Sequence, residues 1–222
     1  MFYQDTQRVY RSSLLEGFSW LEHGFGTRQA GVWVGGPLAT LRQVHSAHWL
    51  YAHGRTGTIG EADALISDSP GLMIGVWTAD CLPVLIADPT HKVVAAIHAG
   101  WRGLAAGIAG AVIAGMRRRF DSRPEQLLVA VGPGICGACY EVGPEVAARF
   151  APWLPELGSV QGRLTVDLAV ILTRQLLEAG VARQSLDLSR LCTACRPDEF
   201  FSYRKGSGRG QRMLSAIGLA HP

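Results

Sequence analysis

Two apolar segments, at residues 83–87 and 92–98, are separated by only four residues, among them Asp88 and Pro89, which favour a turn. A parallel strand pair needs a crossover of about a dozen residues, so this short connection favours an antiparallel hairpin. Further apolar segments at 71–77 and 127–131 are bounded by turn residues and are typical of buried strands. The chain is therefore expected to build a sheet that contains antiparallel strands.

Helical patterns follow and separate these strands. We expect helices over three segments: from the reversal at 99–103 to about 120, 145–150 and 166–179. Gly180 is a suitable stop for the last of them. Clustered strands followed by helices are typical of α+β proteins. The prediction is an α+β fold with a mixed, largely antiparallel sheet in a single domain over residues 1–222, because no repeat or linker marks a boundary.

Composition excludes several classes of protein. Apolar residues make up 48% of the 222 residues and charged residues 18%, which is not the composition of a disordered chain. The net charge of +3 gives no reason to expect binding to nucleic acid or to an acidic membrane. No secretory signal is visible, and the longest uncharged apolar run, 103–116, is too short for a bilayer. We expect a cytoplasmic monomer.

Three segments place a metal-binding side chain beside a chain reversal, and these side chains are His45, Cys81 and His98. Two imidazoles and a thiolate suit Zn²⁺, and three protein ligands leave a fourth position for water, as catalytic zinc requires. Alternatives remain open, because a cysteine at the end of an apolar strand is commonly a core residue and His98 also fits a hydrogen-bonded core histidine. His48 is a weaker candidate that one helical face would bring beside His45.

Two other segments combine features that suit anion or base binding. The reversal at 98–103 has two glycines and Arg102, which suits either a phosphate site or simply a tight turn. The segment 200–206 places aromatic rings beside cations, with Tyr203 next to Arg204. Such a pair suits stacking on a planar base and holding an anion, and the segment equally fits a strand with one packed face.

The remaining cysteines form two C-x-x-C pairs: Cys136 with Cys139, and Cys192 with Cys195. An odd total of five cysteines without a secretory signal argues for reduced thiols rather than a disulfide framework. Two such pairs are able to build a tetrathiolate zinc site, although their separation exceeds the usual zinc-ribbon spacing. Neither pair clearly opens a helix after a strand, which disfavours a redox motif. Binding of a second metal stays open at this point.

Together these segments resemble one protein family closely. The motifs that carry the resemblance are HGFGTR at 23–28, QVH at 43–45, DALI at 63–66, TADCLPV at 78–84, HAGWRG at 98–103, GPGI at 132–135, CYEVG at 139–143, CT at 192–193 and FSYR at 201–204. They cover nearly the whole chain in the family's order. The family is that of the laccase-like multicopper polyphenol oxidoreductases, which are also interpreted as zinc-dependent purine nucleoside phosphorylases that deaminate adenosine.

The resemblance implies a layered α/β sandwich and one catalytic zinc held by His45, Cys81 and His98. It implies phosphorolysis of adenosine, inosine and methylthioadenosine with inorganic phosphate, and deamination of adenosine. Asp80 and His48 are then candidates for proton transfer, by proximity alone. The expected substrate-binding residues are Arg102, Tyr203 and Arg204.

One departure from the family and three rival functions bear on this expectation. Only 14 residues separate Arg28 from Gln43, where relatives carry a longer segment, which predicts a more open site and an altered substrate preference. One rival is a thiol hydrolase on acyl substrates such as cell-wall precursors, with Cys81 as nucleophile and His98 or His45 as base. Copper-dependent phenol oxidation is disfavoured, because several copper centres need more ligands than seven histidines provide. A non-catalytic binding module is the last rival.

Overall fold

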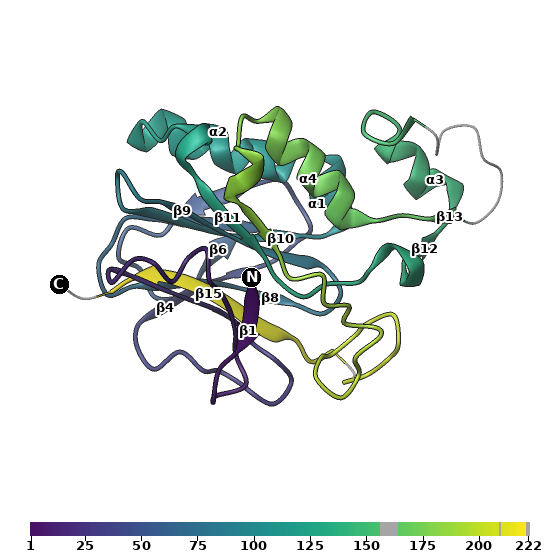
Figure 1. Ribbon diagram of the computed structural model, residues 1–222, viewed down its shortest axis with the longest axis horizontal. Helices are drawn as coiled ribbons and strands as arrows, with labels where there is room; N and C mark the ends of the chain where they lie inside the picture. Colours follow the sequence, from purple (N-terminus) through teal and green to yellow (C-terminus); the bar gives the residue numbers. More distant parts are fainter. Residues whose placement is uncertain (156–163, 209, 221–222) are drawn as a thin grey trace.

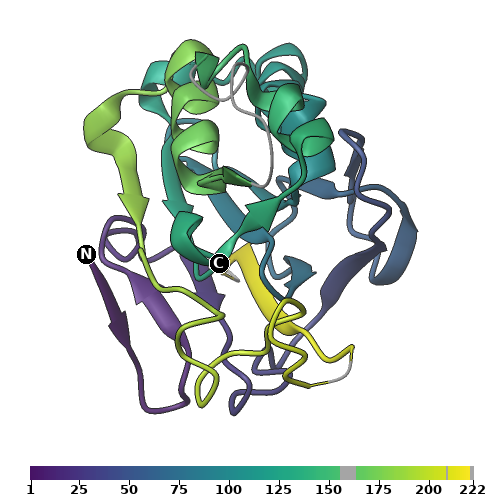
Figure 2. The same cartoon turned by 90° about the vertical axis from the view of Figure 1, so that its right-hand side faces the viewer.

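The computed structural model describes residues 1–155, 164–208 and 210–220, and it has three layers: two β-sheets packed face to face, and helices over the outer face of one of them (Figure 1). Figure 2 shows the helices gathered above the sheets from a second direction. The predicted layered α+β architecture is therefore confirmed.

The larger sheet has seven strands. In spatial order they are β1 (Phe2–Gln4), β2 (Tyr10–Ser12), β3 (Leu21–Phe25), β15 (Met213–Leu219), β8 (Met73–Thr78), β4 (Leu38–Arg42) and β6 (Gly57–Glu61). Strand β4 pairs in parallel with both β8 and β6, whereas the other pairs of this sheet are antiparallel. The C-terminal strand β15 therefore lies in the middle of the sheet, between β3 and β8.

The second sheet has six strands and carries the helices. In spatial order its strands are β14 (Leu186–Leu188), β11 (Leu128–Val131), β9 (Leu82–Asp88), β10 (Val93–Ala99), β7 (Ala64–Ser67) and β5 (Trp49–Tyr51). A separate two-stranded ribbon joins β12 (Glu141–Val142) to β13 (Leu164–Thr165). Antiparallel pairs outnumber parallel ones, and the parallel pairs here are β5–β7 and β11–β14. The prediction of a largely antiparallel, mixed arrangement is correct, although the chain forms two main sheets.

The predicted hairpin at 83–98 is the centre of the second sheet. Strands β9 and β10 pair along their whole length, from Val93 opposite Asp88 to Ala99 opposite Leu82, and every residue of both strands is buried. Side chains such as Leu85 face the other sheet, whereas those of the opposite parity, such as Val84, face the helices. Because both faces are covered, these strands have continuous apolar sequences rather than an alternating pattern.

The helices occupy the predicted positions, with one difference. They are α1 (Trp101–Ala105), α2 (Ile108–Phe120), α3 (Pro144–Ala147) and α4 (Leu168–Glu178), with 3₁₀ turns η1 (Pro124–Gln126), η2 (Gly137–Cys139), η3 (Ala148–Phe150) and η5 (Arg183–Ser185). The single helix expected from 99–103 to 120 was wrong, because Gly107 adopts a left-handed conformation (φ +76°) and divides it into α1 and α2. None of the described helices has the length and apolar character that a membrane span requires.

Helix α4 begins and ends where its terminal residues dictate. The Asp167 side chain accepts hydrogen bonds from the backbone N–H groups of Ala169 (2.9 Å) and Val170 (3.2 Å), as an N-cap residue does. Gly180, at φ +95°, follows the helix and ends it as expected. The apolar side of the helix joins the core between the helices and the six-stranded sheet.

A buried histidine in the larger sheet links stability to pH. His23 lies on β3 with 3% of its surface exposed, and the backbone N–H of Ser12 donates to its Nε2 at 2.9 Å. That hydrogen bond requires an unprotonated Nε2. Burial, reinforced by the positive charge of Arg11, lowers the pKa of His23 to about 4.

We therefore expect His23 to make the folded protein less stable in acid. The unfolded chain binds a proton on this side chain below its ordinary pKa of 6.5, whereas the folded protein binds one only near pH 4, so the stability present above pH 6.5 is lost as the pH falls to 4. The loss from this residue is about 3 kcal/mol. Urea unfolding at several pH values should show a smaller loss of unfolding free energy in His23→Gln than in the wild type. An equal loss in both proteins would contradict this assignment.

Candidate metal centre

His45, Cys81 and His98 meet where three strands end. His45 follows β4, Cys81 lies between β8 and β9, and His98 is near the end of β10. Their potential ligand atoms all lie within 4.8 Å of one another, and the two imidazole rings meet edge to face with centroids 4.8 Å apart. The structure thus brings together the three side chains that the sequence singled out from distant segments.

The backbone around this cluster is unusual in two ways. His45 (φ +60°) and Asp80 (φ +85°) are non-glycine residues in the left-handed region, where backbone conformations are costly. Gly100 packs against the cluster so closely that a Cβ atom there would lie 3.0 Å from the Cys81 sulfur and 3.2 Å from Cδ2 of His45. A Cβ atom on Gly103 would lie 2.9 Å from the backbone oxygen of Ser46. Both glycines of the predicted reversal therefore have a packing role.

A buried carboxylate organises two of the three segments. Asp63 is fully buried, and it accepts hydrogen bonds from Nδ1 of His98 (2.8 Å), the backbone N–H of His45 (2.9 Å), and both the backbone N–H (2.5 Å) and the hydroxyl (2.8 Å) of Ser46. The bond to Nδ1 leaves Nε2 of His98 available to a metal, which is the usual arrangement around a zinc-binding histidine.

Sequence reasoning gave Asp63 no role, although its motif was part of the family resemblance. A signal was present: an acidic residue immediately precedes the apolar strand β7, and β7 pairs with β10, which carries His98. A carboxylate at the start of a fully buried strand needs partners, because an unpaired buried charge is costly.

The cluster combines acidic groups that ionise readily with a strongly basic histidine. Burial alone would raise the pKa of Asp63, but hydrogen bonds from His98 and Ser46 lower it to about 2. Burial alone would lower the pKa of His98, but its hydrogen bonds with Asp63 and Cys81 raise it to about 9. For the Cys81 thiol, the hydrogen bonds with His45 and His98 outweigh burial and lower the pKa to about 7. A thiolate forms readily here, and one thiolate with two imidazoles is a donor set that fits Zn²⁺.

A cavity of about 660 Å³ opens beside the cluster. Its lining includes aromatic and cationic side chains: Trp77, Trp101, Tyr140, Tyr203, Arg102, Arg204 and Arg212. The three predicted substrate-binding residues, Arg102, Tyr203 and Arg204, are all in this lining, and so is Asp80. Tyr140 and Arg212 were not predicted. Tyr140 lies inside the CYEVG motif, which sequence reasoning used only for the resemblance.

Asp80 holds the C-terminal wall of this cavity. One of its carboxylate oxygens accepts a hydrogen bond from the Thr193 hydroxyl (2.6 Å), and the other accepts one from the backbone N–H of Arg204 (2.7 Å). The Arg204 guanidinium donates to the backbone oxygen of Glu141 (2.8 Å) and lies 5.1 Å from the Tyr140 ring centre. The carboxylate beside Cys81 therefore positions this loop; its predicted part in proton transfer stays a prediction.

The structure excludes two alternatives that the sequence left open. Residues 43–48 form a loop rather than a helix, so His48 does not share a helical face with His45; its side chain is exposed and it is not part of the cluster. Residues 200–206 are a series of turns rather than a strand, with Phe200 fully buried and Tyr203 86% exposed. The turns project Tyr203 and Arg204 toward the cavity, because glycines in this segment, such as Gly206 (φ +66°), permit the reversals.

Comparison with known proteins identifies close relatives. The family model described as "Multi-copper polyphenol oxidoreductase laccase" matches residues 26–220. A purine nucleoside phosphorylase of Deinococcus radiodurans is 41% identical over 188 residues, which cover 82% of this chain and 70% of that protein. An adenosine deaminase, RL5, from an unknown prokaryotic organism is 36% identical over 156 residues, which cover 66% of this chain and 59% of that protein.

Solved structures give the same result for the fold. The crystal structure of YlmD from Geobacillus stearothermophilus superimposes with a TM-score of 0.89, at 26% identity, over 99% of both chains. In the sequence comparison the purine nucleoside phosphorylase YlmD of Geobacillus stearothermophilus is 36% identical over 162 residues, which span 70% of this chain and 59% of that protein.

The role of Asp63 is testable by substitution. We expect Asp63→Asn to weaken zinc binding by about 10- to 100-fold, because His98 and the loop at 44–46 lose the acceptor that orients them. Competition with a chromophoric chelator measures the affinity.

Asp88→Asn is the matched control. Asp88 is also fully buried and is paired with a histidine, His91, at 2.8 Å, at the opposite end of β9. This variant should lose stability while keeping the zinc affinity of the wild type. If the two variants bind zinc equally well, Asp63 does not orient the ligands.

Proposed function

This chain belongs to the family described as multi-copper polyphenol oxidoreductase laccase, and we propose that it is an enzyme of purine nucleosides that cleaves them with phosphate and deaminates adenosine. The observation that carries the proposal is the cavity of about 660 Å³, whose lining combines the His45, Cys81 and His98 cluster with aromatic rings and guanidinium groups. That volume is within the usual range for a small-molecule site. The names of the relatives, purine nucleoside phosphorylase and adenosine deaminase, support the same activity.

In this proposal His45, Cys81 and His98 hold one zinc ion. When bound, Zn²⁺ supplies Lewis-acid chemistry, because it polarises an oxygen that it contacts and lowers the pKa of water. The donor set does not suit the copper chemistry of the family's name. Among the described residues, the groups whose side chains lie close enough to hold a metal contain only two histidines, His45 and His98. Several copper centres need many histidines.

The chain's own side chains suit the parts of a nucleoside and of phosphate. The exposed ring of Tyr203 offers a stacking surface for a planar purine. Arg102 and Arg204 offer guanidinium groups, which bind phosphate through paired hydrogen bonds. Burial, together with the negative charge of Cys81, raises the pKa of Tyr140 to about 12, so its hydroxyl remains a hydrogen-bond donor.

Asp80 is the candidate for proton transfer. It carries the only carboxylate among the described residues that line the cavity, and its hydrogen bonds to Thr193 and Arg204 fix its orientation. Deamination adds water at the purine C6 and expels ammonia, so a proton must reach the leaving nitrogen. Phosphorolysis joins a phosphate oxygen to the ribose C1′ as the bond to the purine nitrogen breaks, and the purine also takes up a proton. The two reactions need two orientations of the nucleoside.

One observation favours a second candidate, a thiol hydrolase. Hydrogen bonds connect Cys81 to His98 and His98 to Asp63. Burial alone would raise the pKa of Cys81, but its hydrogen bonds with the two histidines lower it to about 7. That is the arrangement of a cysteine nucleophile with an oriented base. The Cys81→Ser variant separates the candidates. The zinc enzyme loses both its activity and the metal of this cluster, whereas a thiol hydrolase loses activity on acyl substrates without any change in bound metal.

Product analysis tests the nucleoside reactions directly. We expect zinc-loaded protein incubated with adenosine to form adenine only when phosphate is present, and to form inosine without phosphate. Chromatography of the purines measures both products. Asp88→Asn, which is distant from the cavity, should retain both reactions. If folded, zinc-loaded wild-type protein forms neither product, the proposal is wrong and the thiol hydrolase becomes the better candidate.

The two reactions should respond differently to loss of Arg102. We expect Arg102→Ala to raise the KM for phosphate about 10-fold or more, because a charge-assisted hydrogen bond to the anion is lost, while deamination of adenosine without phosphate changes less. Steady-state kinetics with varied phosphate measures the effect. Arg117→Ala, an exposed substitution in the last turn of α2, is the control and should change neither reaction. Equal losses in both reactions would mean that Arg102 does not bind phosphate.

A further inference from the structure

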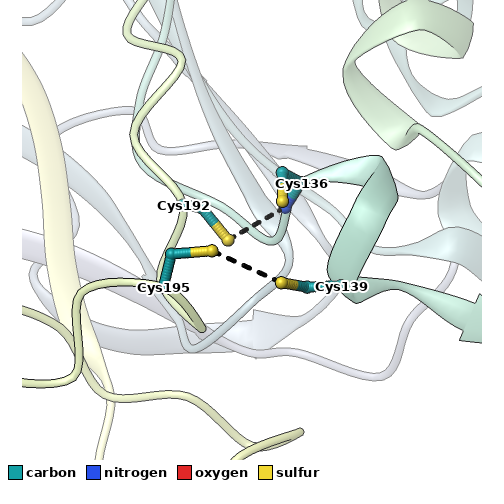
Figure 3. Close-up of side chains that lie close together, drawn as sticks. All are labelled: Cys136, Cys139, Cys192 and Cys195. Carbon is teal, nitrogen blue, oxygen red and sulfur yellow. Dashed lines mark hydrogen bonds between the residues drawn. The ribbon is translucent and has the colours of Figure 1, made fainter.

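We propose that the four cysteines outside the candidate metal centre form a second metal site, which binds one Zn²⁺ through four thiolates and has a structural role. The cysteines are Cys136, Cys139, Cys192 and Cys195. Figure 3 shows their four sulfur atoms converging from two loops. The site shares no ligand with the cluster of His45, Cys81 and His98, and it does not depend on the proposed activity.

The spacing of the sulfur atoms suits a tetrahedral ion. All four lie within 4.8 Å of one another, and those of Cys139 and Cys195 are 3.4 Å apart. Four sulfur ligands at the usual Zn–S distance of about 2.3 Å lie about 3.8 Å from one another. Each sulfur therefore has three sulfur neighbours within 4.8 Å, as a tetrahedral site requires, whereas a disulfide would need only one.

The two loops are brought together by the sheet. Cys136 and Cys139 follow β11, and Cys192 and Cys195 follow β14, and these two strands are parallel neighbours. Parallel strands that pair have their carboxyl ends at the same edge, so the two C-x-x-C pairs meet there despite their long separation in sequence. A parallel bridge between Gly134 and Cys192, with hydrogen bonds from Gly134 to Leu191 (3.1 Å) and from Thr193 to Gly134 (3.1 Å), continues this pairing up to the cysteines.

Each pair is already folded as a metal-binding turn. The backbone N–H of Cys139 donates to the carbonyl of Cys136 (3.0 Å) within η2, and the N–H of Arg196 donates to the carbonyl of Cys192 (3.2 Å). These tight turns place both sulfurs of a pair on one side. The backbone N–H of Cys136 also donates to the Cys192 sulfur at 3.3 Å, so this proposed sulfur ligand accepts a hydrogen bond from the backbone. A preformed ligand set costs less ordering when a metal binds.

The location gives the site a structural role in the cavity wall. Thr193, within the second pair, donates to Asp80, next to Cys81. Tyr140 directly follows Cys139 and lines the cavity. A metal at this position would therefore clamp the loop that carries Tyr140 against the loop that reaches Asp80.

Metal counting on the purified chain tests the proposal. We expect two zinc ions per wild-type chain by atomic emission, one in Cys81→Ser, one in Cys139→Ser/Cys195→Ser, and none when all three substitutions are combined. Cys195 is exposed and Cys139 is only half-buried, whereas Cys192 is buried, so Cys139 and Cys195 are chosen as one member of each pair whose substitution spares the core. One zinc in the wild type that disappears in Cys81→Ser, with no change in the double variant, would overturn the second site.

A second measurement requires no substitution within the four cysteines. Cys81→Ser protein loaded with Co²⁺ should show the intense sulfur-to-cobalt charge transfer of a tetrathiolate site, because the only cysteines left are these four. A spectrum without these bands would overturn the proposal.

A thiol titration distinguishes metal binding from disulfide formation. Wild-type chain is purified without reductant and then unfolded in denaturant with a chelator present. It should titrate as five free thiols. Three thiols or one would mean that disulfides occupy the cluster and would overturn the proposal.

We also expect the double variant to unfold at a Tm lower by about 5 °C or more, while its His45, Cys81 and His98 cluster keeps its zinc. Nucleoside turnover is measured separately, so failure of the proposed activity leaves this result unaffected.

Discussion

One buried carboxylate holds the candidate metal centre in its conformation. Asp63 is fully buried, and the donors around its carboxylate are the ring nitrogen of His98, the hydroxyl of Ser46 and the three backbone N–H groups of residues 44–46. Removing any of these leaves part of a buried charge unsatisfied, which is among the most costly changes in a protein interior. His45 therefore keeps its left-handed backbone conformation, because a change in that conformation would break the hydrogen bonds from the loop at 44–46 to Asp63.

The layers of the fold explain why the site lies at the ends of strands. Strands β9 and β10 are covered on one face by the seven-stranded sheet and on the other by helices, so most of their length is closed to a ligand, and His98 reaches the cavity because it lies next to the end of β10. Only the loops beyond them reach solvent while remaining attached to a rigid platform. Such loops commonly carry function, because the scaffold holds them accurately and tolerates change in their sequence.

Sequence patterns predicted those parts of the molecule that depend on local order. The hairpin at 83–98 followed from a turn too short for a crossover, and α4 followed from apolar periodicity and a terminal glycine. The division at Gly107 was missed because a glycine inside a helical pattern does not reveal its φ angle. The meeting of the two C-x-x-C pairs was left open because it depends on β11 and β14 becoming parallel neighbours, a long-range pairing that spacing along the chain does not encode. Asp63 had no assigned role for the same reason, since its partners are 17 to 35 residues away.

The cavity wall formed by residues 200–208 and 210–212 has a consequence for how proteins of this kind diversify. Residues 203–206 form turns, and Asp80 holds them beside the candidate metal centre, because its carboxylate accepts a hydrogen bond from the backbone N–H of Arg204 rather than from its side chain. A hydrogen bond from a backbone N–H is retained when the side chain of the same residue is replaced, except by proline. Mutations at 203 and 204 can therefore alter which molecules the cavity admits while the ligands of the candidate metal centre stay in place. Substitutions at these two positions can therefore change substrate preference during evolution while the fold is retained.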